Sequence, residues 1–369
     1  MLLQELHPHD AGAFMPTLGQ RETQVLATII ESYIASASPV GSRAVAEHSG
    51  LRLSPASMRA TMSDLTDLGY LEQPHTSAGR VPTARAFRLY VDSLLRPLPL
   101  GCAEREAIAD ELTRQELEIS GILRRAANLL SGHARQLGMV VAPSEDEARW
   151  RSIEFAPAAE GLVLAVLMLE GGLVRTRTVR VDERYGQDEL VRFGNYLNEH
   201  FRGLPLSEAR DRIGRELARA GSRLEEMCMR ALALSRRAVE HMGDDRELIV
   251  NGTLNMLEHA EFTDVSRMRD LLTAIEERSR LLELLDRTLS EKDVRITFCQ
   301  DVPEGAPDGL RGCSVVSAPY GGDTPRGVVS VVGPLRMDYA KIVPVVQCVS
   351  RSLTQLFRER FAAAPSLLP

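Results

Sequence analysis

The chain has 369 residues, of which 44% are hydrophobic and 26% are charged, and its formal net charge at pH 7 is −7. This length exceeds one ordinary core, so two or three domains are expected, and the composition is that of a globular protein rather than a disordered tail or a fibre. The acidic charge argues against a protein that wraps nucleic acid indiscriminately, whereas a sequence-specific binder needs only local cations.

Segments that would send the chain to a membrane or out of the cell are not apparent in the sequence. The longest apolar run, Leu162 to Leu169, is far shorter than the roughly 20 residues that a bilayer span requires. The opening MLLQELHPHD lacks the basic and apolar segments of a secretory signal. We therefore expect a cytoplasmic protein without cofactors, whose cysteines form no C-x-x-C motif and are reduced core thiols: Cys102, Cys228, Cys299, Cys313 and Cys348.

The first hundred residues predict a run of short helices. Residues 1–17 show no periodicity and are expected to be a flexible arm. Apolar side chains then recur every three to four residues, which predicts helices over 21–35, 43–49, 55–68 and 84–95. Ser42 is expected to cap the second helix and Gly50 to end it, while Ser54 before Pro55 is typical of the start of the third.

A hairpin is predicted between the third and fourth helices. Residues 70–73 and 80–82 read as short strands, and the loop Pro74–Gly79 is rich in turn-forming residues. Three helices followed by a hairpin is the order of elements in a winged helix. Residues 18–100 are therefore predicted to be a winged-helix domain, ending in the proline-rich linker 96–101.

The remainder predicts an α+β domain with an insertion. Apolar spacing over 104–137 predicts one long helix, which could pair with another helix or lie on its own domain. Strands are predicted over 151–155, 162–169 and 173–181, a mostly helical region over 187–292, strands over 294–299, 313–318 and 327–332, and a helix over 339–357. Gly161 and the Gly171-Gly172 pair favour an antiparallel meander. Strands, helices and strands again indicate one sheet interrupted by an insertion.

The third helix has the features of a helix that reads DNA. The major groove is only about 12 Å wide, so the leading face of such a helix needs small or polar side chains. If Met58, Met62 and Leu65 are buried, a turn of about 100° per residue puts small side chains opposite them. Arg59 can make a bidentate contact to guanine, a pairing that is worth roughly 1 to 3 kcal/mol of discrimination.

The hairpin loop has the features of a wing. The expected tip is His75-Thr76-Ser77-Ala78-Gly79-Arg80. Its small residues permit close approach to a duplex, and Arg80 at this tip can follow the backbone or enter a narrow minor groove. Ser54, Ser57 and the amides at the helix start can bind phosphate, as can Arg43. The alternative for Arg43, Arg85 and Arg88 is a solvated surface charge. The predicted DNA contacts are Arg43, Ser54, Ala56, Ser57, Arg59, Ala60, Ser63, His75, Thr76, Ser77, Gly79 and Arg80.

Residues 53–92, LSPASMRATMSDLTDLGYLEQPHTSAGRVPTARAFRLYVD, closely resemble the N-terminal domain of heat-inducible transcription repressors of the HrcA type. PHTSAGRVPT is the most specific part. Further similar segments are NGTLNMLEHAEFTDV at 251–265, SVVSAPY at 314–320 and GVVSVVGPLRMDYAKIVPVV at 327–346. One difference is that Ala60 follows Arg59 where the family usually has asparagine, so an adenine contact by that asparagine cannot be made here.

The resemblance implies an α+β multidomain protein. It would contain the winged helix-turn-helix, a GAF-like domain in two segments (104–186 and 291–362) and an inserted, mostly helical dimerisation domain (187–290). It also implies a homodimer that represses chaperone operons through an inverted-repeat operator in double-stranded DNA, is released on heat stress, and depends on the GroE chaperonin for its active form.

The sequence also bears on two other functions, catalysis and the binding of a small effector. An enzyme is not expected, because the only two lysines, Lys292 and Lys341, do not follow glycine as in a P-loop, and no H-E-x-x-H, G-x-S-x-G or G-x-G-x-x-G motif occurs. A regulator gated by a small molecule is the alternative, in which the GAF-like domain binds an effector over its sheet. Cys299, Tyr320 and Arg326 could line such a pocket, although core or surface-loop roles are also open to them.

Overall fold

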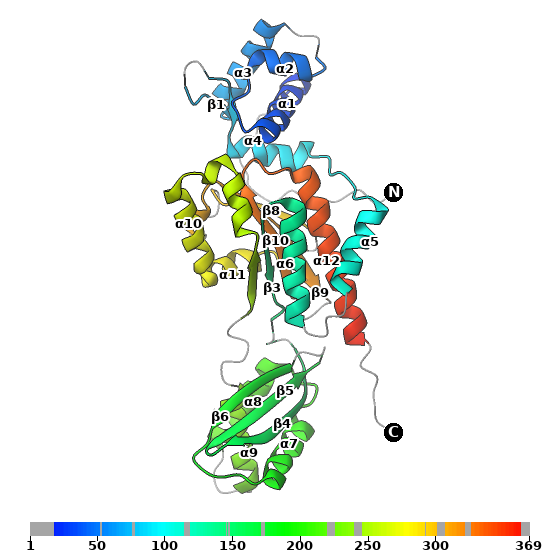
Figure 1. Cartoon of the computed structure of the whole chain (residues 1–369), viewed down its shortest axis with the longest axis vertical. Helices are drawn as coiled ribbons and strands as arrows, with labels where there is room; N and C mark the ends of the chain where they lie inside the picture. The colour runs from blue at the N-terminus through cyan, green and yellow to red at the C-terminus, as the bar shows by residue number, and fades with distance from the viewer. Residues whose placement is uncertain are drawn as a thin grey trace.

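The computed structural model describes residues 18–51, 54–75, 78–113, 119–144, 146, 148–170, 174–219, 226–239, 246–291, 293–300, 307–321 and 326–362. Helix and sheet are both abundant, so the predicted α+β class is confirmed. Figure 1 shows an elongated molecule, with a helical unit at one end, a five-stranded sheet between layers of helices in the middle, and a three-stranded sheet with its own helices at the other end. None of the helices in these residues is long and apolar enough to cross a membrane.

The N-terminal unit, residues 18–100, follows the predicted order of elements. It contains α1 (Gln20–Ser36), α2 (Ser42–His48), α3 (Pro55–Asp67), β1 (Leu71–Glu72), β2 (Val81–Pro82), α4 (Ala84–Leu89) and a π-helical turn η1 (Tyr90–Leu94). Ser42 is the first residue of α2 rather than its cap, and the cap position is taken by Gly41, whose backbone is extended. Gly50 has a φ of 68°, the left-handed conformation predicted for the end of this helix.

The central sheet has the order β7-β3-β10-β9-β8, and each neighbouring pair is antiparallel. Its strands are β3 (Leu137–Val141), β7 (Leu248–Asn251), β8 (Arg295–Phe298), β9 (Cys313–Gly321) and β10 (Arg326–Pro334). The helices α5 (Cys102–Thr113), α6 (Ile119–Ala134) and α12 (Tyr339–Ala362) pack on one face. The short helices η2 (Thr253–Glu258), η3 (Ala260–Phe262) and η4 (Asp308–Leu310) and the helices α10 (Val265–Glu276) and α11 (Arg278–Asp286) pack on the other.

The single long helix predicted over 104–137 is wrong. The Arg125 guanidinium, on α6, donates a hydrogen bond to the Glu111 carbonyl, on α5, at 3.0 Å. Along one continuous helix these residues would lie about 21 Å apart, since each residue advances the chain by about 1.5 Å. Figure 1 accordingly shows α5 and α6 as separate helices on the same side of the sheet. The apolar residues that suggested one long helix belong to two helices, and both sets pack into the same hydrophobic core.

The meander predicted from 151 to 181 is present as β4 (Trp150–Ala159), β5 (Leu162–Leu169) and β6 (Val174–Arg180). The prediction that these strands join the C-terminal strands in one sheet is wrong. They form a sheet of their own, which packs on α7 (Gln187–Phe201), α8 (Leu206–Arg219) and α9 (Glu226–Val239). We call residues 148–239 the three-stranded unit. The helices that directly follow β4 to β6 bury one face of that sheet. The central sheet is completed instead by β3 and β7.

Candidate nucleic-acid interface

Helix α3 presents one buried and one exposed face. The Ser54 side chain accepts a hydrogen bond from the Ser57 amide at 3.2 Å, and Pro55 occupies the first helical position. Met58, Thr61, Met62 and Leu65 are buried against the N-terminal unit. The opposite face is open to solvent and carries small side chains around one cation, at Ser54, Ala56, Arg59, Ala60 and Ser63. Local sequence therefore produces the predicted face, because the cap and the apolar spacing fix both its start and its orientation.

A second arginine, which sequence reasoning missed, holds the start of α3. Arg21, in the first turn of α1, donates hydrogen bonds from Nη2 to the Ser57 carbonyl at 3.2 Å and to Thr61 Oγ1 at 2.6 Å. Ser57 is half-buried, whereas Pro55 and Ala56 before it are exposed. No local pattern marks Arg21, since the contact spans 36 residues and depends on how α1 packs against α3.

Arg80 lies at the base of the hairpin rather than at its tip. Its backbone forms a bridge with Val40, with both N–H···O distances at 2.9 Å, and its Nε donates to Thr66 Oγ1 on α3 at 3.0 Å. The expected arginine-tipped wing is therefore corrected to an arginine that joins the hairpin to α3. Its side chain is half-buried beside the exposed face of that helix.

The small residues of the hairpin are required by the packing of the chain itself, in addition to any role in contacting DNA. A Cβ on Gly79 would lie 2.4 Å from the Val40 carbonyl oxygen, so the chain's own backbone requires glycine there. His75 is exposed, and its carbonyl accepts a hydrogen bond from the Ala78 amide at 2.8 Å, which closes the turn. Thr76 and Ser77, also predicted to contact DNA, lie outside the described residues.

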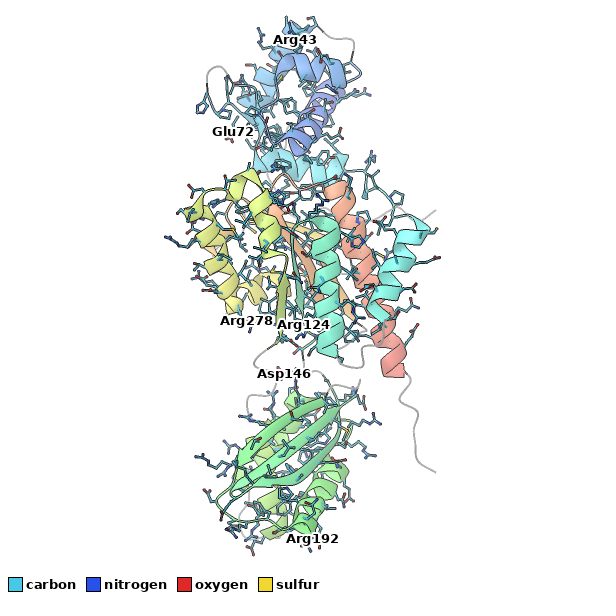
Figure 2. All side chains as sticks on the ribbon, in the orientation of Figure 1. Arg43, Glu72, Arg124, Asp146, Arg192 and Arg278 are labelled. Carbon is cyan, nitrogen blue, oxygen red and sulfur yellow. The ribbon has the colours of Figure 1, made fainter. Side chains whose placement is uncertain are left out.

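Three further arginines were considered as surface cations: Arg43 and Arg85 are exposed and Arg88 is half-buried. Arg43 is exposed on α2, at the outer end of the N-terminal unit (Figure 2). Arg85 stacks over the Tyr70 ring at 4.7 Å and donates to the Leu68 carbonyl at 3.0 Å, so it supports the end of α3. Arg88 lies over the Phe298 ring, 5.5 Å from its centre. Arg85 and Arg88 thus lie over aromatic rings, and Arg43 is the exposed cation at the outer end of the N-terminal unit.

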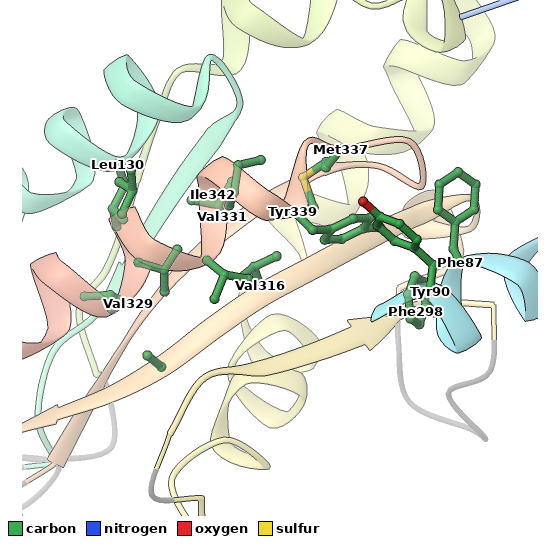
Figure 3. Packing of buried hydrophobic residues seen from close by; sticks show 14 of the residues in the cluster. Phe87, Tyr90, Leu130, Phe298, Val316, Val329, Val331, Met337, Tyr339 and Ile342 are labelled. Carbon is green, nitrogen blue, oxygen red and sulfur yellow. The ribbon is translucent and has the colours of Figure 1, made fainter. Parts of the chain in front are cut away.

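An aromatic junction joins the N-terminal unit to the central sheet. We use this name for Phe87, Tyr90, Phe298 and Tyr339, which lie together in Figure 3. The Tyr339 ring lies 6.4 Å from Phe87 and 6.2 Å from Phe298, between centroids. Burial, followed by the nearby carboxylates of Glu31 and Asp338, raises the pKa of Tyr90 to about 12. Such a buried contact fixes where α3 stands relative to the rest of the chain.

The effector pocket suggested for the sheet is not assembled as expected. Cys299 is part of the buried core beneath α10 and α11, and the hydroxyl of Tyr320 donates to the Val141 carbonyl at 3.0 Å. The side chain of Arg326 lies outside the described residues. A cavity of about 580 Å³ does touch Tyr320, but it opens at the edge of the sheet between β8, β9 and α12 and is lined largely by charged and polar side chains of α12.

Comparison with known proteins gives consistent results over most of the chain. The family model described as the HrcA protein C-terminal domain matches residues 120–343. The heat-inducible transcription repressor HrcA of Nitratidesulfovibrio vulgaris (strain DSM 19637 / Miyazaki F) is 95% identical over 355 residues, which cover 96% of this chain and all of the relative. HrcA of Geobacter sulfurreducens is 39% identical over 343 residues, covering 93% and 99% of the two chains. A solved structure described only as that of a hypothetical protein shares the fold, with a TM-score of 0.58 and 23% identity over 93% of this chain and 98% of its own.

Proposed function

The chain belongs to the HrcA family of heat-inducible transcription repressors, and on this premise we propose that it represses chaperone operons by binding an inverted-repeat operator with the exposed face of α3. The observation that carries the proposal is the exposed strip of small side chains around Arg59, at the capped start of that helix. In this proposal residues 18–100 are a winged helix-turn-helix domain, and the hairpin between β1 and β2 is its wing.

Geometry and charge favour entry of α3 into the groove by its N-terminus. The positive end of the helix dipole lies at the first turn and attracts phosphate, and Arg59 follows one turn later on the open face. Asp64 and Asp67 are exposed at the other end of the helix, where they would already be leaving the groove. Arg43 on α2 and Arg80 at the hairpin base then flank the recognition face and suit phosphate contacts, which set register without reading sequence.

We propose further that two copies pair through the open face of the three-stranded unit. Strand β5 carries apolar residues on both faces: alternate residues are buried by the helices, and Leu164, Val166 and Met168 are half-buried on the other face. An antiparallel sheet with one solvated face normally alternates apolar and polar side chains, so this pattern calls for a second cover. Figure 1 shows no element of the described chain over that face. An identical face on a second copy is the simplest cover, because two-fold pairing is self-complementary.

This dimer proposal changes the expected domain boundaries. The dimerisation domain would comprise the three-stranded unit, residues 148–239, instead of residues 187–290. The GAF-like domain would then be built from the central sheet and the helices on its two faces, with β7 and α10 to α11 included in it.

The chaperonin GroE is proposed as a partner on the strength of the family resemblance. Chaperonins bind exposed apolar surface, and the segment 251–265 holds large apolar side chains that are open to solvent, among them Leu254 at 77% and Val265 at 73% exposure. Co-sedimentation of the purified repressor with GroE at the heat-shock temperature tests this. Binding that the substitutions Leu254→Ser and Val265→Ser weaken supports the proposal, and failure of the unaltered chain to sediment with GroE rejects it.

The proposed DNA contact can be tested by gel-shift titration with fragments from upstream of the chaperone operons. Replacing Arg59 with Ala removes the base contact and should reduce discrimination between operator and scrambled DNA by about 5-fold to about 150-fold, since one bidentate pair is worth roughly 1 to 3 kcal/mol. Arg192→Ala is the matched control, because Arg192 is an exposed arginine at the opposite end of the molecule (Figure 2). Equal operator affinity in both variants would reject the assignment of α3.

A further inference from the structure

Two cysteines face each other at the edge of the central sheet. In the pairing of β8 with β9, Phe298 lies opposite Ser314, so the next position places Cys299 opposite Cys313. The Cys299 amide donates to the Cys313 carbonyl at 3.1 Å, the bond that joins directly opposed residues. Such a pair has its Cα atoms about 5.5 Å apart, within the roughly 4.4 to 6.8 Å that a disulfide spans. Both side chains also lie in the same buried cluster, under α10 and α11, and therefore on the same face of the sheet.

We propose that Cys299 and Cys313 are a reversible dithiol–disulfide pair that, when oxidised by a hydroperoxide, covalently joins β8 to β9. One thiol, as its thiolate, attacks the terminal oxygen of the hydroperoxide; the O–O bond breaks, and an alcohol and a sulfenic acid result. The second thiol attacks the sulfenic sulfur and releases water. In sum, two thiols and one hydroperoxide give one disulfide, one alcohol and one water, with two electrons passing from sulfur to oxygen.

Burial makes this pair slow to react in the closed sheet. Cys299 is 5% exposed and Cys313 is not exposed at all. Burial raises the pKa of both thiols to about 12, and Glu261 adds to the effect at Cys313 while Arg267 opposes it. Because the thiolate is the reactive form, oxidation depends on local opening. Strand β8 is a short edge strand, and edge elements open at a lower free-energy cost than the whole domain. Heating should therefore expose the pair to oxidant before the molecule unfolds.

The pair also lies next to the aromatic junction. Phe298 directly precedes Cys299 and packs against Tyr339 and Arg88, the latter on α4 of the N-terminal unit. The Tyr339 hydroxyl shares a hydrogen bond with Ser314 at 2.8 Å, and both cysteines are among the groups that raise its pKa. A disulfide would hold in place the strand on which Arg88 rests. The oxidised repressor should therefore stay bound to its operator up to a higher temperature. This consequence rests on the proposed function, whereas formation of the disulfide does not.

The test uses full-length protein with Cys102, Cys228 and Cys348 replaced by Ser, so that only the pair can react. The protein is treated with hydrogen peroxide over a series of temperatures up to the onset of unfolding, alkylated and digested. Cleavage after Arg311 separates the two cysteines, so a disulfide appears as two linked peptides. We expect this species, a loss of 2 mass units from the intact chain, and a rise in Tm of about 5 °C or more that dithiothreitol reverses. Tm is followed without DNA, so the result is independent of operator binding.

The matched control adds Cys299→Ser to the same background and should show no linked peptides and no gain in Tm. Far-UV circular dichroism before oxidation checks that both proteins are folded, and Cys313→Ala replaces Cys299→Ser if the latter is not. Oxidation that gives only sulfinic acid or links between molecules would overturn the proposal. So would a 299–313 disulfide that lowers Tm, because the bond would then strain the edge it is proposed to hold.

Discussion

Two adjacent residues fix the start of α3, and two arginines from other elements hold its exposed face in place. Ser54 and Pro55 predict the start of α3 because the cap bond and the fixed proline backbone act within three residues. The sequence did not predict that Arg80 lies at the hairpin base, because its partners Thr66 and Val40 come from other elements. It did not predict a role for Arg21 either, because its partner Ser57 lies 36 residues away on α3. Only the packed N-terminal unit makes those contacts. The side chains that hold the exposed face of α3 are thus harder to predict than the face itself.

Arg80 is expected to act on both DNA and the fold. Replacing it with Ala removes one cation beside α3, so operator affinity should fall for all sequences alike and the slope of log K against log salt should decrease by about 1. Thr66→Val is the control, since it removes the bond to Nε and keeps the charge. Titrations at two salt concentrations measure both effects. A slope that Arg80→Ala leaves unchanged would assign Arg80 a purely structural role.

Tyr90 gives the aromatic junction a pH dependence. Its folded-state pKa is about 12, above the ordinary value of 10.0, so the unfolded chain loses this proton first as pH rises. The contribution of Tyr90 to stability is therefore fully present below pH 10 and is lost as pH rises through about 12. Denaturant unfolding at pH 10, 11 and 12 should show a shallower fall in the free energy of unfolding for Tyr90→Phe than for the unaltered chain. Equal slopes would mean that Tyr90 titrates alike in both states.

At the scale of elements, the sequence predicts helices and hairpins well and sheet membership poorly. The four N-terminal helices and the meander β4 to β6 have strong local periodicity and clear turn residues. Strands β3 and β7 were not predicted, because they have only five and four residues and lie beside helices whose apolar pattern continues into them. Their place in the central sheet comes from pairing with residues far away in the chain, such as Gly138 with Asn251. The boundaries that we propose for the insertion differ from those predicted from the sequence for the same reason.

The dimer proposal can be tested at the open face of β5. Val166→Glu places a charge at the centre of the proposed dimer contact, so the protein should become monomeric at micromolar concentration in sedimentation velocity. Val191→Glu is the matched control, since Val191 is 48% exposed on α7, which covers the opposite face of the sheet. It should leave the dimer intact. A Val166→Glu protein that stays dimeric while remaining folded by circular dichroism would place the contact elsewhere.

At the scale of the whole molecule, the structure sets the proposed DNA-binding face and the proposed dimer face at opposite ends, with the central sheet between them (Figure 1). The aromatic junction and the central core link these ends, so loosening of the middle would alter the spacing of two recognition helices in a dimer. We propose that heat releases the operator through this loosening, because native proteins are only marginally stable. The family resemblance predicted the repressor function, whereas no sequence motif records the packing of the aromatic junction that links the two ends.

The most direct test of operator recognition by α3 uses the immobilised full-length protein. Sheared genomic DNA from the strain that encodes the chain is passed over it, and the bound fragments are sequenced. We predict enrichment of one shared inverted repeat upstream of chaperone genes at the growth temperature, its release on heating, and a loss of sequence preference in Arg59→Ala but not in Arg192→Ala. Retention of no common repeat, or of the same repeat by the Arg59→Ala protein, would contradict the claim that the exposed face of α3 reads the operator.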